Sequence, residues 1–166
     1  VKNIESPKWL KDRLTSIGLR PISALVDITN YVTYDLGRPL HVYDADKVSG
    51  NLTMRLANKD EECLALNEVN YKCTEDMIVI SDDNNKLHGI GGVMGGLDSG
   101  CSMKTNNVFL EVALFNPISV TKTGRKLNLE KRLVKLSSGP QTTLGLMITV
   151  FLKFSNAFCS PRNFDF

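Results

Sequence analysis

The spacing of apolar residues changes near Asn51, and this change limits the folds that the chain can adopt. Before that point, apolar residues recur every three or four positions, as they do in amphipathic helices. After it, the segment LTMRLA alternates in steps of two, and MIVIS and VFLEVALF are short runs rich in β-forming residues. The sequence therefore predicts helices before Asn51 and, after it, a β-rich region that forms a mixed or antiparallel sheet.

The segment SPKWLKDRLTSIG predicts a first helix between Ser6 and Gly18. Ser6 is a favourable N-cap residue, and Pro7 suits the first turn, where an N–H group has no partner within the helix. Gly18 suits the left-handed position that ends many helices. Trp9, on this helix, is expected to pack against the protein rather than to stack on a nucleic-acid base.

The segment from Ser23 to Gly37 predicts a second helix with a single apolar stripe. Thr29 sits beside the stripe, and Asn30 lies further round the helix. Gly37 marks the end of the helix, and Arg38-Pro39 begins a loop that is expected to present His41. The stripe, which is expected to be buried, consists of Leu25, Ile28, Val32 and Leu36.

The character of the sequence changes after Glu130, which sets the predicted domain boundary. Before it, Asn116-Pro117 is a cap-plus-proline start for a further helix. After it, KRLVKLSSGP has no clear period, and LGLMITVFLKF fits a buried helix but is too short to span a bilayer. Residues 1–130 are therefore expected to form one domain, and residues 131–166 a divergent tail that is partly helical or disordered.

Charge and cysteine content narrow the classes of function. With 20 basic and 18 acidic residues, the formal net charge is +2, which argues against a dedicated nucleic-acid surface but allows brief contact with RNA inside a larger assembly. The 4 cysteines form no C-x-x-C pair, and 2 histidines cannot complete a finger-type zinc site. We therefore expect reduced thiols, no metal site, and a cytoplasmic protein without a membrane segment.

The stretch GIGGVMGG, residues 89–96, is the most conspicuous local feature. It lacks the spacing of a dinucleotide-binding fingerprint, because Met94 stands where a glycine is required, and it lacks the Gly-Lys-Ser/Thr ending of a P-loop. Two interpretations remain. The glycines either permit tight turns and close packing of strands, or Gly92 and Gly95 leave out side chains so that a ligand can approach the backbone.

Glu111 interrupts the apolar strand VFLEVALF. Alternation along a strand places it on the same face as Phe109 and Ala113. An ionised carboxylate on a covered face is costly unless it is paired or hydrogen-bonded. Glu111 therefore either lies on a solvated edge strand or accepts a hydrogen bond from a ligand in a pocket.

The polar residues Thr29, Asn30 and His41 are ambiguous when each is considered alone. A single histidine in a loop is more often structural than functional, and polar positions on a helix are common. No serine or cysteine pairs with a histidine and an aspartate in a way that suggests a catalytic triad. His88 and the acidic pair Asp82-Asp83 fit a solvated turn.

Several segments, taken together, resemble the beta subunit of bacterial-type phenylalanyl-tRNA synthetase: SPKWLKDRL, GLRPISALVDITNYVTYDLGRPLHVYDADKV, GIGGVMGG, VFLEVALFNPISV and GRKLNL. They occur in order and with suitable spacing, and they match the central editing module of that subunit over about Ser6 to Glu130. Such a series of long motifs is far more specific than one glycine loop. The resemblance implies an α+β fold, in which helices pack on a mixed or antiparallel β-sheet framework. It also implies hydrolysis of tyrosine mistakenly attached to tRNA-Phe.

The resemblance also implies a set of site residues. In this assignment, the Glu111 carboxylate accepts the hydroxyl proton of the tyrosine. Gly92 and Gly95 keep the pocket floor open. Thr29, Asn30 and His41 position the aminoacyl ester and its attacking water. Two residues are thus assigned as catalytic, His41 and Glu111, and four as substrate-binding, Thr29, Asn30, Gly92 and Gly95.

The partners that the resemblance implies lie outside this chain. They are the aminoacylated 3′ end of tRNA-Phe, the alpha subunit of the synthetase and the remaining domains of the beta subunit. No cofactor is implied for this fragment, since ATP and Mg²⁺ serve the full enzyme and bind elsewhere. The segment from Lys131 to Pro140 departs from the family where another pocket wall is expected. Two alternatives to a ligase fragment therefore stay open: a non-enzymatic remnant of a degraded or frameshifted gene, and a freestanding trans-editing hydrolase.

Overall fold

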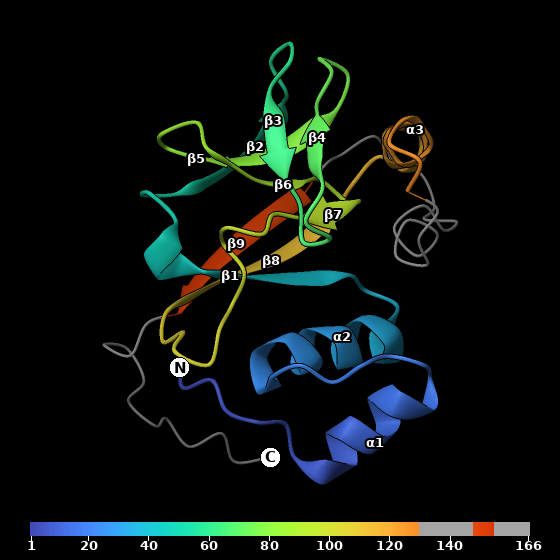
Figure 1. Ribbon diagram of the computed structural model, residues 1–166, viewed down its shortest axis with the longest axis vertical. Coiled ribbons are helices and arrows are strands. Elements are labelled where there is room, and N and C mark those ends of the chain that lie inside the picture. Colours follow the sequence, from blue (N-terminus) through green and yellow to red (C-terminus); the bar gives the residue numbers. More distant parts are fainter. Residues whose placement is uncertain (130–147, 155–166) are drawn as a thin grey trace.

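The computed structural model describes residues 1–129 and the backbone of residues 148–154 (Figure 1). Helices and antiparallel strands share one framework, and the prediction of an α+β fold is confirmed. In chain order, the elements are α1 (Lys8–Ser16), α2 (Ala24–Leu36), β1 (Leu40–Asp44), the short 3-10 helix η1 (Ala45–Lys47), β2 (Leu52–Leu56), β3 (Glu62–Leu64), β4 (Asn70–Lys72), β5 (Ile78–Asp82), β6 (Leu87–Ile90), β7 (Met94–Gly95), β8 (Val108–Leu114), α3 (Pro117–Lys126) and β9 (Ile148–Phe154).

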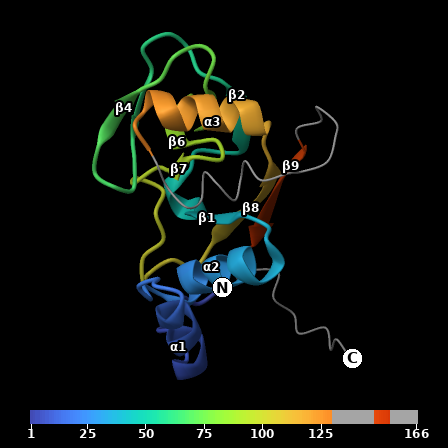
Figure 2. The ribbon, with the colours of Figure 1, turned by 90° about the vertical axis from the view of Figure 1, so that its right-hand side faces the viewer.

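All strand pairs in the described part of the chain are antiparallel. One sheet has the order β1-β8-β9, a second has the order β2-β5-β6-β7, and β3 and β4 pair with each other. Helices α1 and α2 lie on one side of β1, and the four-stranded sheet lies on the other side (Figure 1). Helix α3 lies beside the four-stranded sheet, away from α1 and α2 (Figure 2).

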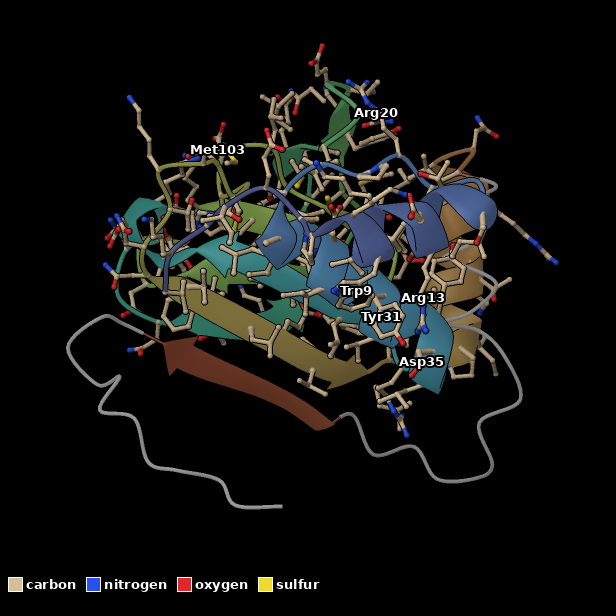
Figure 3. The ribbon with its side chains drawn as sticks, turned by 90° about the horizontal axis from the view of Figure 1, so that it is seen from below. Trp9, Arg13, Arg20, Tyr31, Asp35 and Met103 are labelled. Atoms are coloured by element: carbon tan, nitrogen blue, oxygen red, sulfur yellow. The ribbon has the colours of Figure 1, made fainter. Side chains whose placement is uncertain are left out.

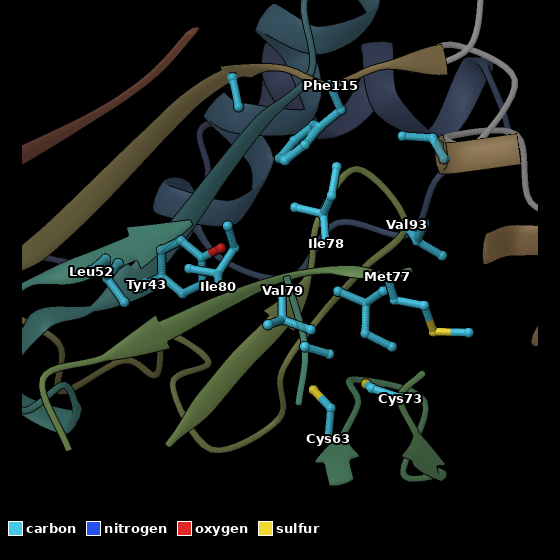
Figure 4. Close-up of a cluster of buried hydrophobic side chains, with 14 of the residues drawn as sticks. Tyr43, Leu52, Cys63, Cys73, Met77, Ile78, Val79, Ile80, Val93 and Phe115 are labelled. Atoms are coloured by element: carbon cyan, nitrogen blue, oxygen red, sulfur yellow. The ribbon is translucent and has the colours of Figure 1, made fainter. Parts of the chain in front are cut away.

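The hydrophobic core joins the two larger sheets (Figure 4). Tyr43 and Phe109 reach it from the β1-β8 pair, and Val79 and Ile80 reach it from β5, whose residues are all buried. Burial of one large apolar side chain contributes about 1.5–3 kcal/mol, so a cluster of this kind fixes one sheet against the other. It thereby sets the distance between β1 and the glycine-rich segment around β6 and β7.

Helix α1 is tied to α2 by a buried polar contact. The prediction of Ser6 as the N-cap is wrong, because Pro7 occupies that position and the Ser6 hydroxyl instead donates a hydrogen bond to the buried Asp27 carboxylate. The same carboxylate accepts the backbone N–H of Ile22 at 2.9 Å. Gly18 has a φ of +79°, as expected for the residue that follows the helix. Asp27 therefore fixes how the two helices lie against each other.

Helix α2 buries a different face from the one predicted. Ile28 and Leu36 of the predicted stripe are 50% and 70% exposed. Thr33 can face the interior because its hydroxyl donates to the Thr29 carbonyl at 2.7 Å and accepts the N–H of Leu40 at 3.1 Å. The residues of α2 that are buried instead are Ala24, Asp27, Thr29 and Thr33.

Trp9 lies on the outer surface of the α1–α2 pair with Arg13 and Tyr31 (Figure 3). The Trp9 and Tyr31 ring centroids are 5.7 Å apart in an edge-to-face arrangement. The Arg13 guanidinium lies 5.7 Å from each ring centroid and donates to the Tyr31 hydroxyl at 2.8 Å. Trp9 thus packs against its own protein, although it remains 53% exposed.

Strand β8 follows the predicted alternation, with Phe109, Glu111 and Ala113 buried on one face. It is the central strand of its sheet, so the interpretation of Glu111 as a solvated edge residue is wrong. His41 also differs from the expectation of a loop residue. It is the second residue of β1, because pairing with β8 already begins at Leu40.

His88 and Asp82 are buried, and the prediction of a solvated turn is wrong for this pair. The His88 Nε2 atom lies 3.1 Å from Asp82 Oδ2. The same carboxylate accepts the backbone N–H groups of Ser49, Asn84 and Lys86 at 3.1, 3.0 and 2.9 Å. Asp82 therefore organises the turn between β5 and β6, and the pair is structural.

Strand β9 pairs with β8 along its full length, from Val108↔Phe154 to Leu114↔Ile148. The prediction of a helix over LGLMITVFLKF is therefore wrong for Ile148–Phe154. The rest of that segment lies outside the described residues, and the domain boundary at Glu130 stays a prediction. Within the described ranges, no helix is long and apolar enough to cross a membrane, and no group of three or more His, Cys, Asp or Glu residues could hold a metal ion.

Candidate active site

A pocket of about 410 Å³ opens between α2, the β1-β8 pair and the glycine-rich segment around β6 and β7. Its volume is within the range of small-molecule binding sites. Its described lining is mainly apolar and includes no lysine, arginine or aspartate. All of the residues assigned to a site from the sequence line it: Thr29, Asn30, His41, Gly92, Gly95 and Glu111.

The pairing of β1 with β8 brings the two proposed catalytic residues together. His41 and Glu111 are direct partners in the antiparallel register. Side chains of directly opposite residues project from the same face of a sheet, and residues two apart on one strand also share a face. His41, Tyr43 and Glu111 therefore all face the pocket side of this sheet, and all line the pocket.

Glu111 is only 6% exposed, and its environment favours the protonated form. Burial raises the pKa of Glu111 to about 7, although a hydrogen bond from the Tyr43 hydroxyl opposes that rise. The bond is accepted by Oε2, and Oε1 accepts no hydrogen bond from any residue that the structure describes. The carboxyl group can therefore change its charge near neutral pH, and one of its oxygens remains available to a ligand.

His41 is partly buried, and its ring packs edge-on against Tyr43 with 4.4 Å between ring centroids. Burial lowers the pKa of His41 to about 4. The imidazole is therefore neutral at pH 7, with one nitrogen that can accept a proton or hydrogen bond and one that can donate. Neither nitrogen is hydrogen-bonded to a residue within the described ranges, so both can serve a bound molecule or water.

The two predicted site glycines make room for side chains of the protein itself. A Cβ atom at Gly95 would lie 2.4 Å from Cε1 and 2.6 Å from Nε2 of His41. A Cβ atom at Gly92, where φ is +68°, would lie 2.8 Å from Val120 and 2.9 Å from Phe115. Close packing therefore accounts for both glycines. Their contribution to ligand approach stays a prediction, since the His41 and Phe115 rings form the wall at these points.

Thr29 and Asn30 reach the pocket from α2. The Thr29 hydroxyl donates to the Val26 carbonyl at 2.8 Å, which leaves its oxygen lone pairs as acceptors. The Asn30 amide has no hydrogen bond to the described residues, so it offers both a donor and an acceptor. Together they provide polar groups on the wall of an otherwise mainly apolar pocket.

The sequence interpretation did not identify Tyr43 as a pocket residue. Tyr43 is 1% exposed and lines the pocket. Its ring packs against His41, and its hydroxyl donates a hydrogen bond to Glu111. The signal was present in the sequence, because in HVYD the tyrosine follows the histidine by two positions and so shares its face in a strand. It was missed because this segment was predicted as a loop. Cys101 also lines the pocket, and no pattern in the sequence pointed to it. Burial raises the pKa of its thiol to about 11.

Comparison with known proteins identifies relatives over most of the chain. The sequence pattern of the B3/4 domain matches residues 1–137. A phenylalanine–tRNA ligase beta subunit from Wolbachia sp. subsp. Brugia malayi is 55% identical over 129 residues, and one from Mesorhizobium japonicum is 57% identical over 129 residues. Each alignment covers 78% of this chain and 16% of the relative, so the chain spans only about one sixth of the length of these relatives.

Among solved structures, an N-terminal fragment of the phenylalanyl-tRNA synthetase beta subunit from Pyrococcus horikoshii is similar, with 12% sequence identity and a TM-score of 0.47. The match covers 66% of this chain and 36% of that fragment.

Proposed function

The chain belongs to the B3/4 domain family, and from that premise we propose that it is an editing module that hydrolyses tyrosine from mischarged tRNA-Phe. The observation that carries the proposal is the carboxyl group of Glu111. It is buried in a mainly apolar pocket, and its Oε1 atom accepts no hydrogen bond from the described residues. A phenol hydroxyl is a donor that such an acceptor needs.

Selection of tyrosine over phenylalanine follows from the cost of an unpaired polar group. A pocket built to hydrogen-bond a hydroxyl can reject the analogue that lacks it by a factor of about 10⁴ or more. Phenylalanine would displace water from Glu111 without replacing the lost hydrogen bond. Tyrosine restores that bond, so Glu111 favours the amino acid that a synthetic site for phenylalanine excludes least well.

Hydrolysis of the ester requires a placed water molecule and support for the developing oxyanion. The neutral imidazole of His41 can hold such a water through its unprotonated nitrogen. With a pKa of about 4 it is a weak base at neutral pH, so its main contribution is to orient the water rather than to take its proton. Thr29 and Asn30, on the opposite wall, can bind the ester and the terminal ribose.

The proposed hydrolysis takes place at the end of a tRNA and, in the cell, beside partners that the 166 residues do not include. The substrate is the aminoacylated 3′ end of tRNA-Phe, and the module acts in the cytoplasm beside the alpha subunit and the other beta-subunit domains of a phenylalanine–tRNA ligase. Hydrolysis at this pocket uses no cofactor. ATP and Mg²⁺ belong to the aminoacylation reaction and bind elsewhere in the full enzyme.

The test compares deacylation of tyrosyl-tRNA-Phe and phenylalanyl-tRNA-Phe by the purified chain. The wild type is expected to release tyrosine in preference to phenylalanine, and Glu111→Ala is expected to lose that preference. Glu62→Ala is a matched control, since this glutamate is exposed on β3 and, among the described residues, accepts a hydrogen bond only from Asn70. Equal rates on both esters by a cooperatively folded wild type would overturn the proposal.

A further inference from the structure

Tyr43 places a second phenol against the carboxylate that is proposed to recognise tyrosine. Its hydroxyl donates to Glu111 Oε2, and its side chain is 1% exposed. Burial, followed by the nearby carboxylate, raises the pKa of Tyr43 well above its usual range, so the hydroxyl keeps its proton. A donor that cannot ionise at physiological pH is therefore fixed beside Glu111.

The surroundings of Tyr43 hold its ring in one place. It is paired with Phe109 in the β1-β8 register and belongs to the buried core cluster. Its ring packs edge-on against His41, and a Cβ atom placed at Gly89 would lie 3.6 Å from its hydroxyl oxygen. The hydroxyl can therefore neither swing away from Glu111 nor reach solvent without disturbing the core.

A carboxylate has two oxygens, and here one of them is already occupied. We propose that Tyr43 is a positioning residue that holds Glu111 through Oε2, so that Oε1 is the atom that accepts the hydroxyl of a tyrosyl ester. This inference rests on the proposed function. It adds that recognition needs a carboxylate whose orientation is fixed by a phenol of the protein itself.

The same hydrogen bond also keeps Glu111 available as an anion. Burial raises the pKa of Glu111, and the Tyr43 hydrogen bond lowers it. The other titratable groups of the described pocket lining are His41 on β1, which is neutral at pH 7, and the Cys101 thiol, whose raised pKa also keeps it neutral. With no cation among the described lining residues, the Tyr43 hydroxyl is the group that offsets burial of the charge.

The substitution that tests this inference is Tyr43→Phe, which removes the hydroxyl and keeps the ring. The preference for the tyrosyl over the phenylalanyl ester is expected to fall about tenfold, the effect of one hydrogen bond to a charged group. The pH at which that preference is half-maximal is expected to rise. Tyr71→Phe is the matched control, because Tyr71 does not line the pocket and its hydroxyl, among the described residues, accepts a hydrogen bond only from Asn67.

A purely structural role for the Tyr43 hydroxyl would lower the stability of Tyr43→Phe but leave both the preference and its pH profile unchanged, and that result would overturn the inference. Failure of the proposed function looks different, since the wild type itself would then show no preference. In that case, two measurements replace the ester assay. One is an NMR titration of the Glu111 carboxyl carbon, and the other compares the affinity of the pocket for p-cresol with its affinity for toluene. An unchanged Glu111 midpoint and unchanged p-cresol binding in Tyr43→Phe would then overturn the inference.

Discussion

His41 and Glu111 lie directly opposite each other on β1 and β8, so that two groups with displaced pKa values share one face of a sheet inside the same pocket. Burial lowers the pKa of His41 to about 4 and raises that of Glu111 to about 7. Burial disfavours the charged form of each group, so it lowers the pKa of a base and raises the pKa of an acid. Between these values both side chains are neutral, and above them only Glu111 is charged.

Glu111→Gln is expected to stabilise the protein above pH 7. The pKa of Glu111 in the folded protein, about 7, is higher than the usual value of 4.5. The wild type therefore loses stability as the pH rises from the lower of these values to the higher. Glutamine has no charge to bury and can still accept the Tyr43 hydrogen bond. Urea unfolding at pH 8 should show a gain of about 1–3 kcal/mol, and the gain should disappear near pH 4. A loss of stability at pH 8 would contradict the raised pKa.

His41→Gln is expected to reduce the sensitivity of the fold to acid. The pKa of His41, about 4, is below that of an unfolded histidine, so the wild type keeps its full stability above about pH 6.5 and loses it as the pH falls toward 4. The variant should lose about 2 kcal/mol less over that interval. Proton NMR of the 2 histidines offers a direct check, since the His41 ring should titrate near pH 4. Titration of that ring near pH 6.5 would disprove the prediction.

Gly95→Ala is expected to abolish selective deacylation. The new methyl group would lie 2.4 Å from the His41 ring and 3.0 Å from Leu66, so the imidazole must leave its position. Gly18→Ala is a useful comparison, because a Cβ atom there meets nothing within 4 Å and only the positive φ of +79° is unfavourable. It should cost about 1 kcal/mol of stability and leave the ester preference intact. Retention of full activity by Gly95→Ala would show that His41 is not needed where it lies.

Asp27→Ala is expected to destabilise the α1–α2 pair strongly. Asp27 is fully buried and accepts the Ser6 hydroxyl and the Ile22 N–H, so its loss leaves the buried Ser6 hydroxyl and the partly buried Ile22 N–H without this acceptor. The expected cost is about 2–4 kcal/mol in urea unfolding. Asp12→Ala removes only an exposed ion pair with Lys8 and should change stability by less than about 1 kcal/mol. Equal effects of the two substitutions would rule out Asp27 as the link between the helices.

Local sequence signals determined the features that depend on a few neighbouring residues. Asn116 caps α3 through hydrogen bonds from Ile118 and Ser119, as its place before Pro117 predicts. Gly37 takes the left-handed conformation after α2. The alternation in VFLEVALF correctly placed Glu111 on the same face of a strand as Phe109 and Ala113. Each of these follows from backbone sterics or from the period of a single element, which the sequence contains in full.

Contacts between distant segments decided the rest. The sequence could not show that α2 would bury Thr29 and Thr33 and expose Ile28, because hydrogen bonds to α2 itself and to Leu40 make the polar face acceptable. It could not show that β8 is central, since the partner strands on both sides come from remote parts of the chain. For the same reason, His41 was assigned to a loop, and Tyr43 was overlooked beside it.

The sequence by itself determined the family, the α+β composition and the residue types that the pocket needs. Only the tertiary structure decided that these residues meet, that Tyr43 occupies one oxygen of Glu111, and that the space left by Gly95 is filled by His41. The physical reason is that burial, and with it the pKa of a side chain, is a property of the elements packed around a residue. A sequence specifies those elements one at a time, whereas a pocket exists only after they have packed together.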